Sequence, residues 1–374
     1  MLTIIENVHL YQPEDKGIND IVVCGAKIVD IGRDLAVSYP LAKRINATGL
    51  LATPGYIDQH VHIIGGGGKG SFRTRIPELQ LSSCISGGVT TLVGLMGTDG
   101  ITKSVENLVA KTKALNEEGI TAYCLTGSYE YPCITLTGNL KKDIVFIQEI
   151  IGVKIAISDH RSSNPTKQEL IRLISDVRLA ALMSGKPGIV TIHVGRGKGK
   201  MDVLFEILSE TNLPIKHLRP THLGNHREQA VKFAVMGGYI DFTASNNPSE
   251  VATDITKALG NGAPLKLVTL SSDSNGSFPN EVENIGIKAA SMDSLHNVIK
   301  TLIQEQKMSI SSAISLVTSN VAEALDLSDH KGRLLPGCDA DILLLEEDLR
   351  INTVIAQGRI LMQSGEIKVK GTFE

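Results

Sequence analysis

The chain has 374 residues, of which 42% are hydrophobic and 21% charged, so it can bury a full core and lacks the composition of a disordered protein. Its 37 basic and 40 acidic side chains leave a net charge of −3, which argues against a dedicated nucleic-acid or anionic-membrane surface. Aromatic residues make up 4% and tryptophan is absent, which argues against a protein that stacks bases or sugars.

Signals for export, membrane insertion or disulfide bonding are missing from the sequence. The first residues lack the basic and apolar regions of a signal peptide, and no uncharged apolar run reaches the roughly 20 residues of a membrane span. The five cysteines are dispersed and form no C-x-x-C pair, so we predict neither a disulfide framework nor a thiolate zinc site. We therefore expect a cytoplasmic protein with no membrane partner.

In chain order, the first 50 residues hold short apolar runs, at 2–5 and 20–31, without a long helical pattern. From residue 50 to about 280, β-rich runs alternate with amphipathic stretches. The predicted strands are 55–63, 89–95, 121–127, 153–158, 188–194, 218–223, 239–244 and 267–272. The clearest predicted helices between them are 104–118, 167–183, 201–211 and 228–236. Eight strands over roughly 230 residues favour an α/β fold of the (β/α)₈ (TIM) barrel type. A doubly wound sheet would alternate similarly, but the first strand is not followed by a well-placed G-x-G-x-x-G.

The C-terminal part again contains short apolar runs. A helical stretch at 309–325 precedes predicted strands at 340–345, 353–356 and 367–370, with turns at Gly337 and Gly358. Because chain termini often lie close together, the two β-rich ends are expected to meet as a small β-sandwich domain. The predicted domains are therefore 1–52 and 329–374 for the small β domain and 53–328 for the barrel.

The first chemical signal is the pair His60-x-His62 in the first barrel strand. Residues i and i+2 of a strand point to the same side, so both imidazoles can reach one ion. This pair alone does not distinguish a metal site from two structural histidines.

Three further candidate ligands end later barrel strands: His193 the fifth, His222 the sixth and Asp273 the eighth. Barrel chemistry gathers at the C-terminal ends of the strands, so these side chains are expected to converge with the histidine pair. Imidazole and carboxylate ligands suit zinc, and a catalytic zinc keeps an open position for water.

Lys154 is unusual because it lies inside the apolar fourth strand. A buried lysine needs either a partner or a lowered pKa. One reading is a salt bridge across the barrel mouth to Asp159. The other is carbamylation by CO₂, which would convert the amine into an anionic ligand able to bridge two metal ions roughly 3.5–4 Å apart.

The order His60-x-His62, Lys154, His193, His222 and Asp273 resembles the ligand order of the amidohydrolase superfamily in its two-metal form. Within it, the surrounding residues are most similar to the isoaspartyl (β-aspartyl) dipeptidase family. The similar stretches are 54–68, 95–99, 125–129, 152–162, 269–277 and 369–374, so the resemblance extends over essentially the whole chain.

The resemblance implies a binuclear zinc hydrolase that cleaves the β-aspartyl bond of small dipeptides by attack of a metal-bridging hydroxide. His60, His62 and Asp273 would hold one zinc, His193 and His222 the other, and carbamylated Lys154 would bridge them. Tyr129 would polarise the carbonyl and Asp273 would transfer the proton to the leaving amine. The implied substrate-binding residues are Gly67, Thr98, Arg161 and Ser277. A homo-oligomer is also implied, with an octamer as one option.

Two positions depart from the family pattern. Lys69 follows the glycine run where the family has a glutamate for the substrate's α-amino group. Asn225 replaces a family arginine three residues after His222, and Arg227 could take over only if that loop is rearranged. A cation facing an ammonium weakens binding.

The alternatives are therefore the same machinery acting on an amide without a free α-amine, such as an N-acyl amino acid, an N-carbamoyl amino acid or a cyclic imide, and a non-catalytic scaffold of amidohydrolase ancestry. Such scaffolds have usually lost metal ligands, and the candidate ligands are all present here.

Overall fold

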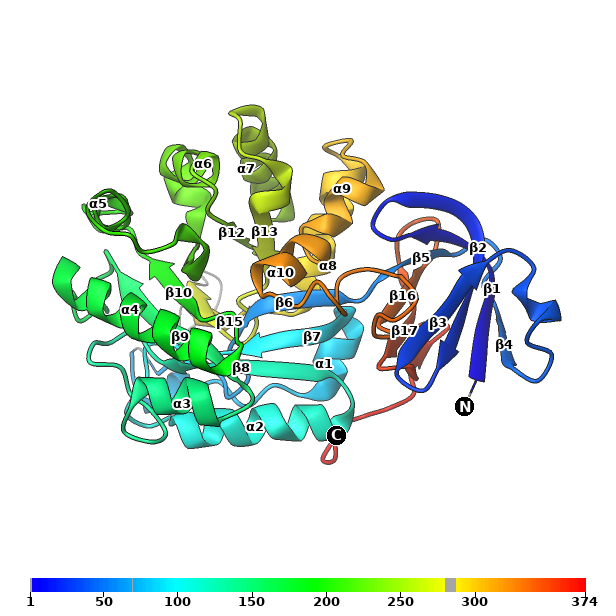
Figure 1. Ribbon diagram of the computed structural model, residues 1–374, viewed down its shortest axis with the longest axis horizontal. Helices are drawn as coiled ribbons and strands as arrows, with labels where there is room; N and C mark the ends of the chain where they lie inside the picture. Colours follow the sequence, from blue (N-terminus) through cyan, green and yellow to red (C-terminus); the bar gives the residue numbers. More distant parts are fainter. Residues whose placement is uncertain (1, 69, 280–286) are drawn as a thin grey trace.

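The computed structural model describes residues 2–68, 70–279 and 287–374. The molecule has two parts that lie side by side, a barrel and a sheet built from both ends of the chain (Figure 1).

The barrel strands are parallel. In the described chain, one six-stranded sheet follows the sequence order β6 (Tyr56–Val61), β7 (Val89–Gly94), β8 (Thr121–Gly127), β9 (Ile150–Ile157), β10 (Ile189–Val194) and β11 (Leu218–Thr221). A separate parallel pair consists of β12 (Ile240–Thr243) and β13 (Val268–Ser271). All eight predicted strands are confirmed within the described residues. Their runs of β-branched residues are buried on both faces, as in parallel sheets covered by helices.

Side chains join the strand pair β12–β13 to the six-stranded sheet. Between β11 and β12, the Thr221 hydroxyl donates to Asp241 Oδ2 at 2.7 Å. From β6, Gln59 Nε2 donates to Thr269 Oγ1 of β13 at 2.7 Å and to Asp241 Oδ1 of β12 at 2.8 Å. The His62 amide also donates to the Ser274 carbonyl at 2.9 Å, just beyond the strand ends. These bonds close the barrel where backbone ladders are interrupted.

Helices follow the barrel strands and cover the outside of the barrel (Figure 1). They are α1 (Leu81–Ser86), α2 (Val105–Glu118), α3 (Leu140–Phe146), α4 (Lys167–Ser184), α5 (Asp202–Glu210), α6 (Arg227–Val235), α7 (Pro248–Gly260) and α8 (Asp293–Gln304). Ser104 caps α2, and Thr166 with Glu169 forms a capping box at the start of α4, which is why both begin where the sequence predicts. The predicted helical stretch 309–325 is divided into α9 (Ile310–Ser315) and α10 (Ser319–Ala324).

Both ends of the chain contribute to one mixed sheet of nine strands within the described residues. Its N-terminal members are β1 (Leu2–Tyr11), β2 (Asp15–Cys24), β3 (Lys27–Gly32), β4 (Lys43–Asn46) and β5 (Leu51–Pro54). Its C-terminal members are β16 (Ile342–Leu345), β17 (Ile351–Ala356), β18 (Arg359–Gln363) and β19 (Glu366–Ile367). β5 pairs with β1 on one side and with β16 on the other, so the prediction that the termini meet is confirmed. β5 runs across the predicted boundary at 52/53, β18 was not predicted, and β19 ends at Ile367 rather than at 370.

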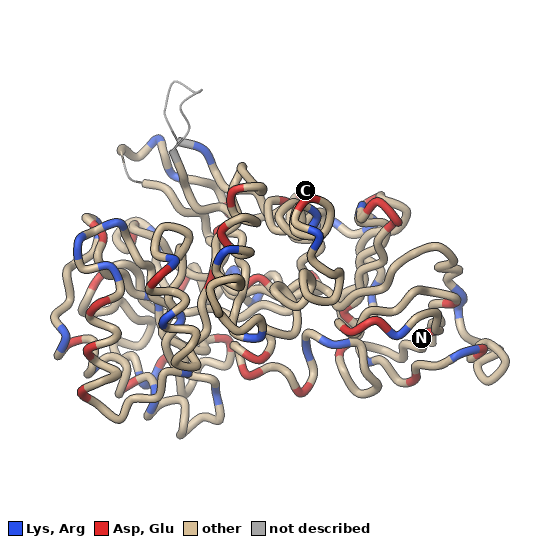
Figure 2. The backbone as a smooth tube through the Cα atoms, turned by 90° about the horizontal axis from the view of Figure 1, so that it is seen from above, with Lys and Arg blue, Asp and Glu red and all other residues tan. Residues whose placement is uncertain are grey.

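Shorter elements complete the described structure. The hairpin β14 (Ser277–Pro279) and β15 (Ile287–Ala289) follows β13, and 3₁₀ turns lie at Leu35–Val37, Phe72–Thr74, Ile215–His217, Leu223–His226 and Leu265–Leu267. Basic and acidic residues are interspersed along both parts of the molecule (Figure 2). Among the described residues, no helix is both long and apolar enough to cross a membrane.

Candidate active site

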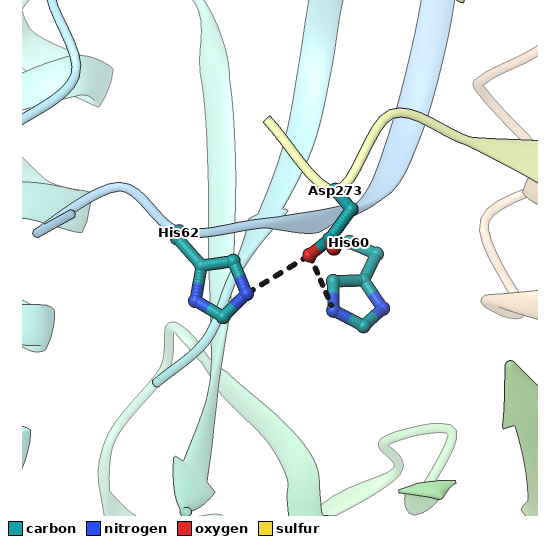
Figure 3. A group of neighbouring side chains, drawn as sticks. All are labelled: His60, His62 and Asp273. Atoms are coloured by element: carbon teal, nitrogen blue, oxygen red, sulfur yellow. Dashed lines mark ion pairs between the residues drawn. The ribbon is translucent and has the colours of Figure 1, made fainter. Parts of the chain in front are cut away.

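His60, His62 and Asp273 converge at the C-terminal end of the barrel (Figure 3). Asp273 Oδ1 lies 3.0 Å from His62 Nε2 and 3.3 Å from His60 Nε2. His60 lies in β6 and His62 directly follows it, whereas Asp273 lies two residues after β13, the strand next to β6 where the barrel closes. The geometry thus brings Asp273 to a histidine pair that lies more than 200 residues earlier in the sequence.

Two candidate ligands have unusual backbone conformations. His222 has φ 66° and Asp273 has φ 52°, both in the left-handed region that residues with a Cβ rarely adopt. His222 directly follows β11 and Asp273 lies two residues after β13, so both left-handed residues lie where the chain leaves a strand at the barrel mouth. Such strain is characteristic of functional sites, where the surrounding structure holds it.

His193 and His222 form a second group next to the first. Their ring centroids are 4.5 Å apart, and the His222 ring lies 5.0 Å from that of His60. His193 Nε2 lies 2.9 Å from Asp159 Oδ2, which leaves the lone pair on Nδ1, and this nitrogen lies 2.8 Å from the Tyr129 hydroxyl. Asp159 therefore fixes the ring nitrogen that is available to a metal.

Lys154 lies beside His60 and is fully buried in β9. Its Nζ is 3.3 Å from His60 Nε2 and 5.9 Å from the centroid of the Tyr129 ring. Burial lowers the pKa of Lys154 to about 7, so the neutral amine is accessible near neutral pH. The alternative partner, Asp159, binds Arg161 and His193 instead.

Burial also keeps His60, His193 and His222 neutral. It lowers the pKa of His60 to about 3 and that of His193 to about 4, and the pKa of His222 is likewise well below its usual value. Burial opposes ionisation of Asp273, but its contacts with His60 and His62 hold its pKa well below the usual range. The site thus combines neutral imidazoles at these three positions with a carboxylate, the protonation states that metal binding requires.

The donor atoms fit a metal ion. The ligand atoms of His60, His62 and Asp273 all lie within 4.8 Å of one another. Asp273 Oδ1 is buried yet accepts no well-aligned hydrogen bond, although His62 Nε2 is close. A buried oxygen in this state is costly unless a cation satisfies it, and imidazole with carboxylate is a donor set typical of zinc.

A cavity of about 680 Å³ opens over these groups. The predicted site residues along its wall are His62, Gly67, Thr98, Tyr129, Arg161, His193, His222, Asp273 and Ser277. Gly67 has φ 84°, and a Cβ there would lie 2.1 Å from the Thr74 carbonyl oxygen, so only glycine lets this loop fold back beside the cavity. Arg161 is held over the Tyr129 ring, 5.1 Å from its centroid.

The two departures from the family pattern are placed differently. Lys69 lies outside the described residues. Asn225 lines the cavity, whereas Arg227 is not among its described lining residues and forms an ion pair with Asp254 at 3.1 Å.

Some residues of the site have roles that were not predicted from the sequence, among them Asp159, which was considered only as a salt-bridge partner of Lys154. Asp159 and Thr243 orient His193 and His222, with Thr243 Oγ1 2.8 Å from His222 Nδ1. Arg196 and His226 line the cavity. Arg196 lies three residues after His193, and this proximity to a predicted ligand at a strand end would have identified it as a candidate.

Comparison with solved structures gives close matches. The β-aspartyl dipeptidase of Fervidobacterium islandicum AW-1, solved alone and with β-Asp-Leu, is 42% identical, with 98% of this chain and 99% of that chain covered and a TM-score of 0.92. D-hydantoinase shares the fold, with a TM-score of 0.74 at 16% identity over 100% of this chain and 98% of that chain.

Among curated proteins, L-hydantoinase of Paenarthrobacter aurescens is 22% identical over 96% of this chain and 88% of its own length. The match to allantoinase of Enterococcus faecalis is 41% identical but covers only 20% of this chain and 16% of that protein.

The profile of the amidohydrolase family matches residues 51–361, a segment that contains the whole barrel and every candidate metal ligand. With the fold and the donor set in agreement, this chain belongs to the amidohydrolase family and is a metal-dependent hydrolase.

Proposed function

We propose that this protein hydrolyses the β-aspartyl (isoaspartyl) peptide bond of small dipeptides. The observation that carries the proposal is the 42% identity to a β-aspartyl dipeptidase over 98% of this chain. The described cavity supports it, since the candidate metal ligands lie beside Arg161 and Ser277, which offer a cation and a hydroxyl to an acidic substrate.

The proposed cofactor is a pair of zinc ions. His60, His62 and Asp273 would hold one ion, His193 and His222 the other, and Lys154 as its carbamate would lie between them. The 3.3 Å approach of Lys154 to His60 and the 5.0 Å separation of the His60 and His222 rings support this assignment. When bound, two zinc ions supply a hydroxide nucleophile at neutral pH and polarise the amide carbonyl.

The protein's own side chains would position the substrate and move the proton. The Tyr129 hydroxyl donates a hydrogen bond to the developing oxyanion. Asp273 takes the proton lost by the attacking water and delivers it to the leaving amine nitrogen. Arg161 and Ser277 orient the substrate carboxylates, and Gly67 and Thr98 line the wall beside them.

A second candidate is the same chemistry on an amide without a free α-amine. Lys69 and Asn225 stand where the family has a glutamate and an arginine, and Asn225 lines the cavity. The curated relatives named above include L-hydantoinase, which matches 96% of this chain. N-acyl amino acids, N-carbamoyl amino acids and cyclic imides are the substrates to compare.

The deciding experiment measures kcat/KM of the purified protein for β-Asp-Leu, N-acetyl-aspartate and a cyclic imide, for wild type and Lys69→Glu. We expect turnover of β-Asp-Leu, and a gain with Lys69→Glu because the substituted carboxylate would pair with the α-ammonium group of the substrate. The zinc content of the same preparation is measured in parallel.

Each outcome separates the candidates. Efficient β-Asp-Leu turnover by the wild type without a gain in Lys69→Glu would exclude the second candidate. Turnover of only the amine-free substrates would replace the first by the second. Less than one zinc per chain without turnover would favour a non-catalytic scaffold.

A further inference from the structure

The guanidinium groups at the mouth of the barrel differ in whether they are already paired. Arg161 donates Nε and Nη2 to the two oxygens of Asp159, at 2.8 and 2.7 Å. Arg227 pairs with Asp254. Arg196 lines the cavity, and its side chain forms no hydrogen bond or ion pair with any residue in the described ranges. It is therefore a cation available to a ligand.

The backbone on both sides of Arg196 is fixed, although its side chain is exposed. The Gly195 amide donates to the Ile157 carbonyl at 3.0 Å, and the Gly197 amide donates to the Ser158 carbonyl at 2.6 Å. A Cβ on residue 195 would lie 2.5 Å from Asp159 Cβ, so the loop packs directly on the segment after β9. Arg196 is thus presented from a well-held position.

His226 contributes to this placement. Its side chain is 6% exposed, and Nε2 donates to the Gly195 carbonyl at 2.9 Å. With the proton on Nε2, Nδ1 carries the lone pair and cannot donate to an anion. His226 therefore acts as a positioning residue for the Arg196 loop.

Asn225 lies next to His226 and also lines the cavity. Its carboxamide forms no hydrogen bond within the described part of the chain. The hydrogen bond between His226 and the Gly195 carbonyl joins the loop of Asn225 to the loop of Arg196. An amide N–H and a guanidinium are together suited to the two oxygens of a carboxylate.

The position around the barrel indicates which end of a ligand this pair meets. Arg196 and Asn225 follow the fifth and sixth barrel strands, β10 and β11, whereas Gly67 and Thr98 follow the first and second. These strand pairs lie on opposite sides of an eight-stranded barrel. We propose that Arg196 and Asn225 form a carboxylate-binding subsite that selects substrates with an anionic group at the end across from Gly67 and Thr98. This inference rests on the proposed function. It assigns the binding of one substrate carboxylate to Arg196, which is not among the substrate-binding residues predicted from the sequence.

The test compares Arg196→Ala with Lys198→Ala, both as the metal-loaded protein. Lys198 is exposed on the same loop but is not among the residues that line the catalytic cavity, so its variant loses the same charge elsewhere. The substrates are β-Asp-Leu and its two derivatives in which either carboxylate is amidated.

We expect Arg196→Ala to raise KM for β-Asp-Leu by about tenfold or more, with a much smaller change in kcat, because a charge-assisted hydrogen bond in the ground state is lost. Lys198→Ala should stay within about twofold, as expected for an exposed charge screened by solvent. One amidated substrate should show equal KM with wild type and Arg196→Ala, which identifies the bound carboxylate.

Equal KM values for Arg196→Ala and Lys198→Ala with every substrate would overturn the subsite. If the wild type does not hydrolyse β-Asp-Leu, the proposed function fails separately, and calorimetric binding of the dicarboxylate succinate tests the subsite instead. Weaker succinate binding by Arg196→Ala than by Lys198→Ala supports it, and equal affinity overturns it.

Discussion

The surroundings of Tyr129 keep its hydroxyl in the form that can donate a hydrogen bond. The residue is 6% exposed, and its hydroxyl lies 2.8 Å from His193 Nδ1. Burial raises the pKa of its phenol, although nearby Arg161 opposes the shift, so the group stays protonated and can donate. A donor fixed before the reaction begins stabilises developing negative charge without reorganisation.

Tyr129→Phe is therefore expected to lower kcat for β-Asp-Leu by about 10²–10³, the typical effect of removing one oxyanion donor. Steady-state kinetics at saturating substrate provide the measurement. Zinc content should remain unchanged because the phenol is not a proposed ligand. A kcat within twofold of wild type at unchanged zinc content would show that Tyr129 does not polarise the carbonyl.

At the scale of elements, α8 connects the barrel to the terminal sheet through one histidine. His296 Nδ1 lies 3.0 Å from the Tyr56 hydroxyl of β6, and Nε2 lies 2.8 Å from the Leu349 carbonyl between β16 and β17. Burial lowers the pKa of His296 to about 4. His296 is therefore neutral in the folded protein down to about pH 4, whereas in the unfolded chain it would have the usual pKa of 6.5.

This pKa gives a signed pH dependence. Below pH 6.5, the pKa of histidine in the unfolded chain, the unfolded state binds a proton that the folded protein does not bind until about pH 4. The folded state is therefore at full stability above pH 6.5 with respect to this residue, and it loses stability on acidification. The free energy of unfolding should fall by up to about 3 kcal/mol more between pH 7 and pH 4 in wild type than in His296→Gln. Denaturant titrations across this range measure it.

At the scale of the whole molecule, Lys331 joins the C-terminal segment to the barrel. Its side chain is 2% exposed and contacts Asp341 Oδ2 at 2.6 Å, Asp339 Oδ2 at 2.8 Å and the Thr121 hydroxyl of β8 at 2.8 Å. Burial opposes the charge, but the two carboxylates raise the pKa of Lys331, so the ammonium is retained. Lys27 pairs with the same Asp339 at 2.7 Å, but its side chain is 49% exposed.

Lys331→Met should destabilise the protein by about 3–5 kcal/mol, because it leaves the buried carboxylate of Asp341 without a counter-ion. Lys27→Met removes a partner of the same Asp339 from a solvated position and should cost no more than about 1 kcal/mol. Chemical denaturation at pH 7 compares the two. Similar losses for both variants would mean that Lys331 does not connect the two parts of the molecule.

The sequence by itself determined much of this architecture, because strand and helix periodicity is local. The eight buried barrel strands, the capped starts of α2 and α4 and the strand-end positions of His193, His222 and Asp273 follow from residue patterns only a few positions long. The break between α9 and α10 and the strand β18 were missed. In both regions the apolar pattern is too short to show how many helices or strands are present.

Only the tertiary structure decided which charged groups pair. Asp159 binds Arg161 and His193 rather than Lys154, and Arg227 binds Asp254 while Arg196 stays open to the cavity. The physical reason is that charge-assisted hydrogen bonds require heavy-atom distances near 2.8 Å. An ion pair therefore forms only where the folded loops place the two charged groups to within about an ångström of that distance. The spacing of residues along the chain does not predict such a distance. The sequence therefore determined the set of reactive groups, and the folded barrel determined which of them remain free to meet a substrate.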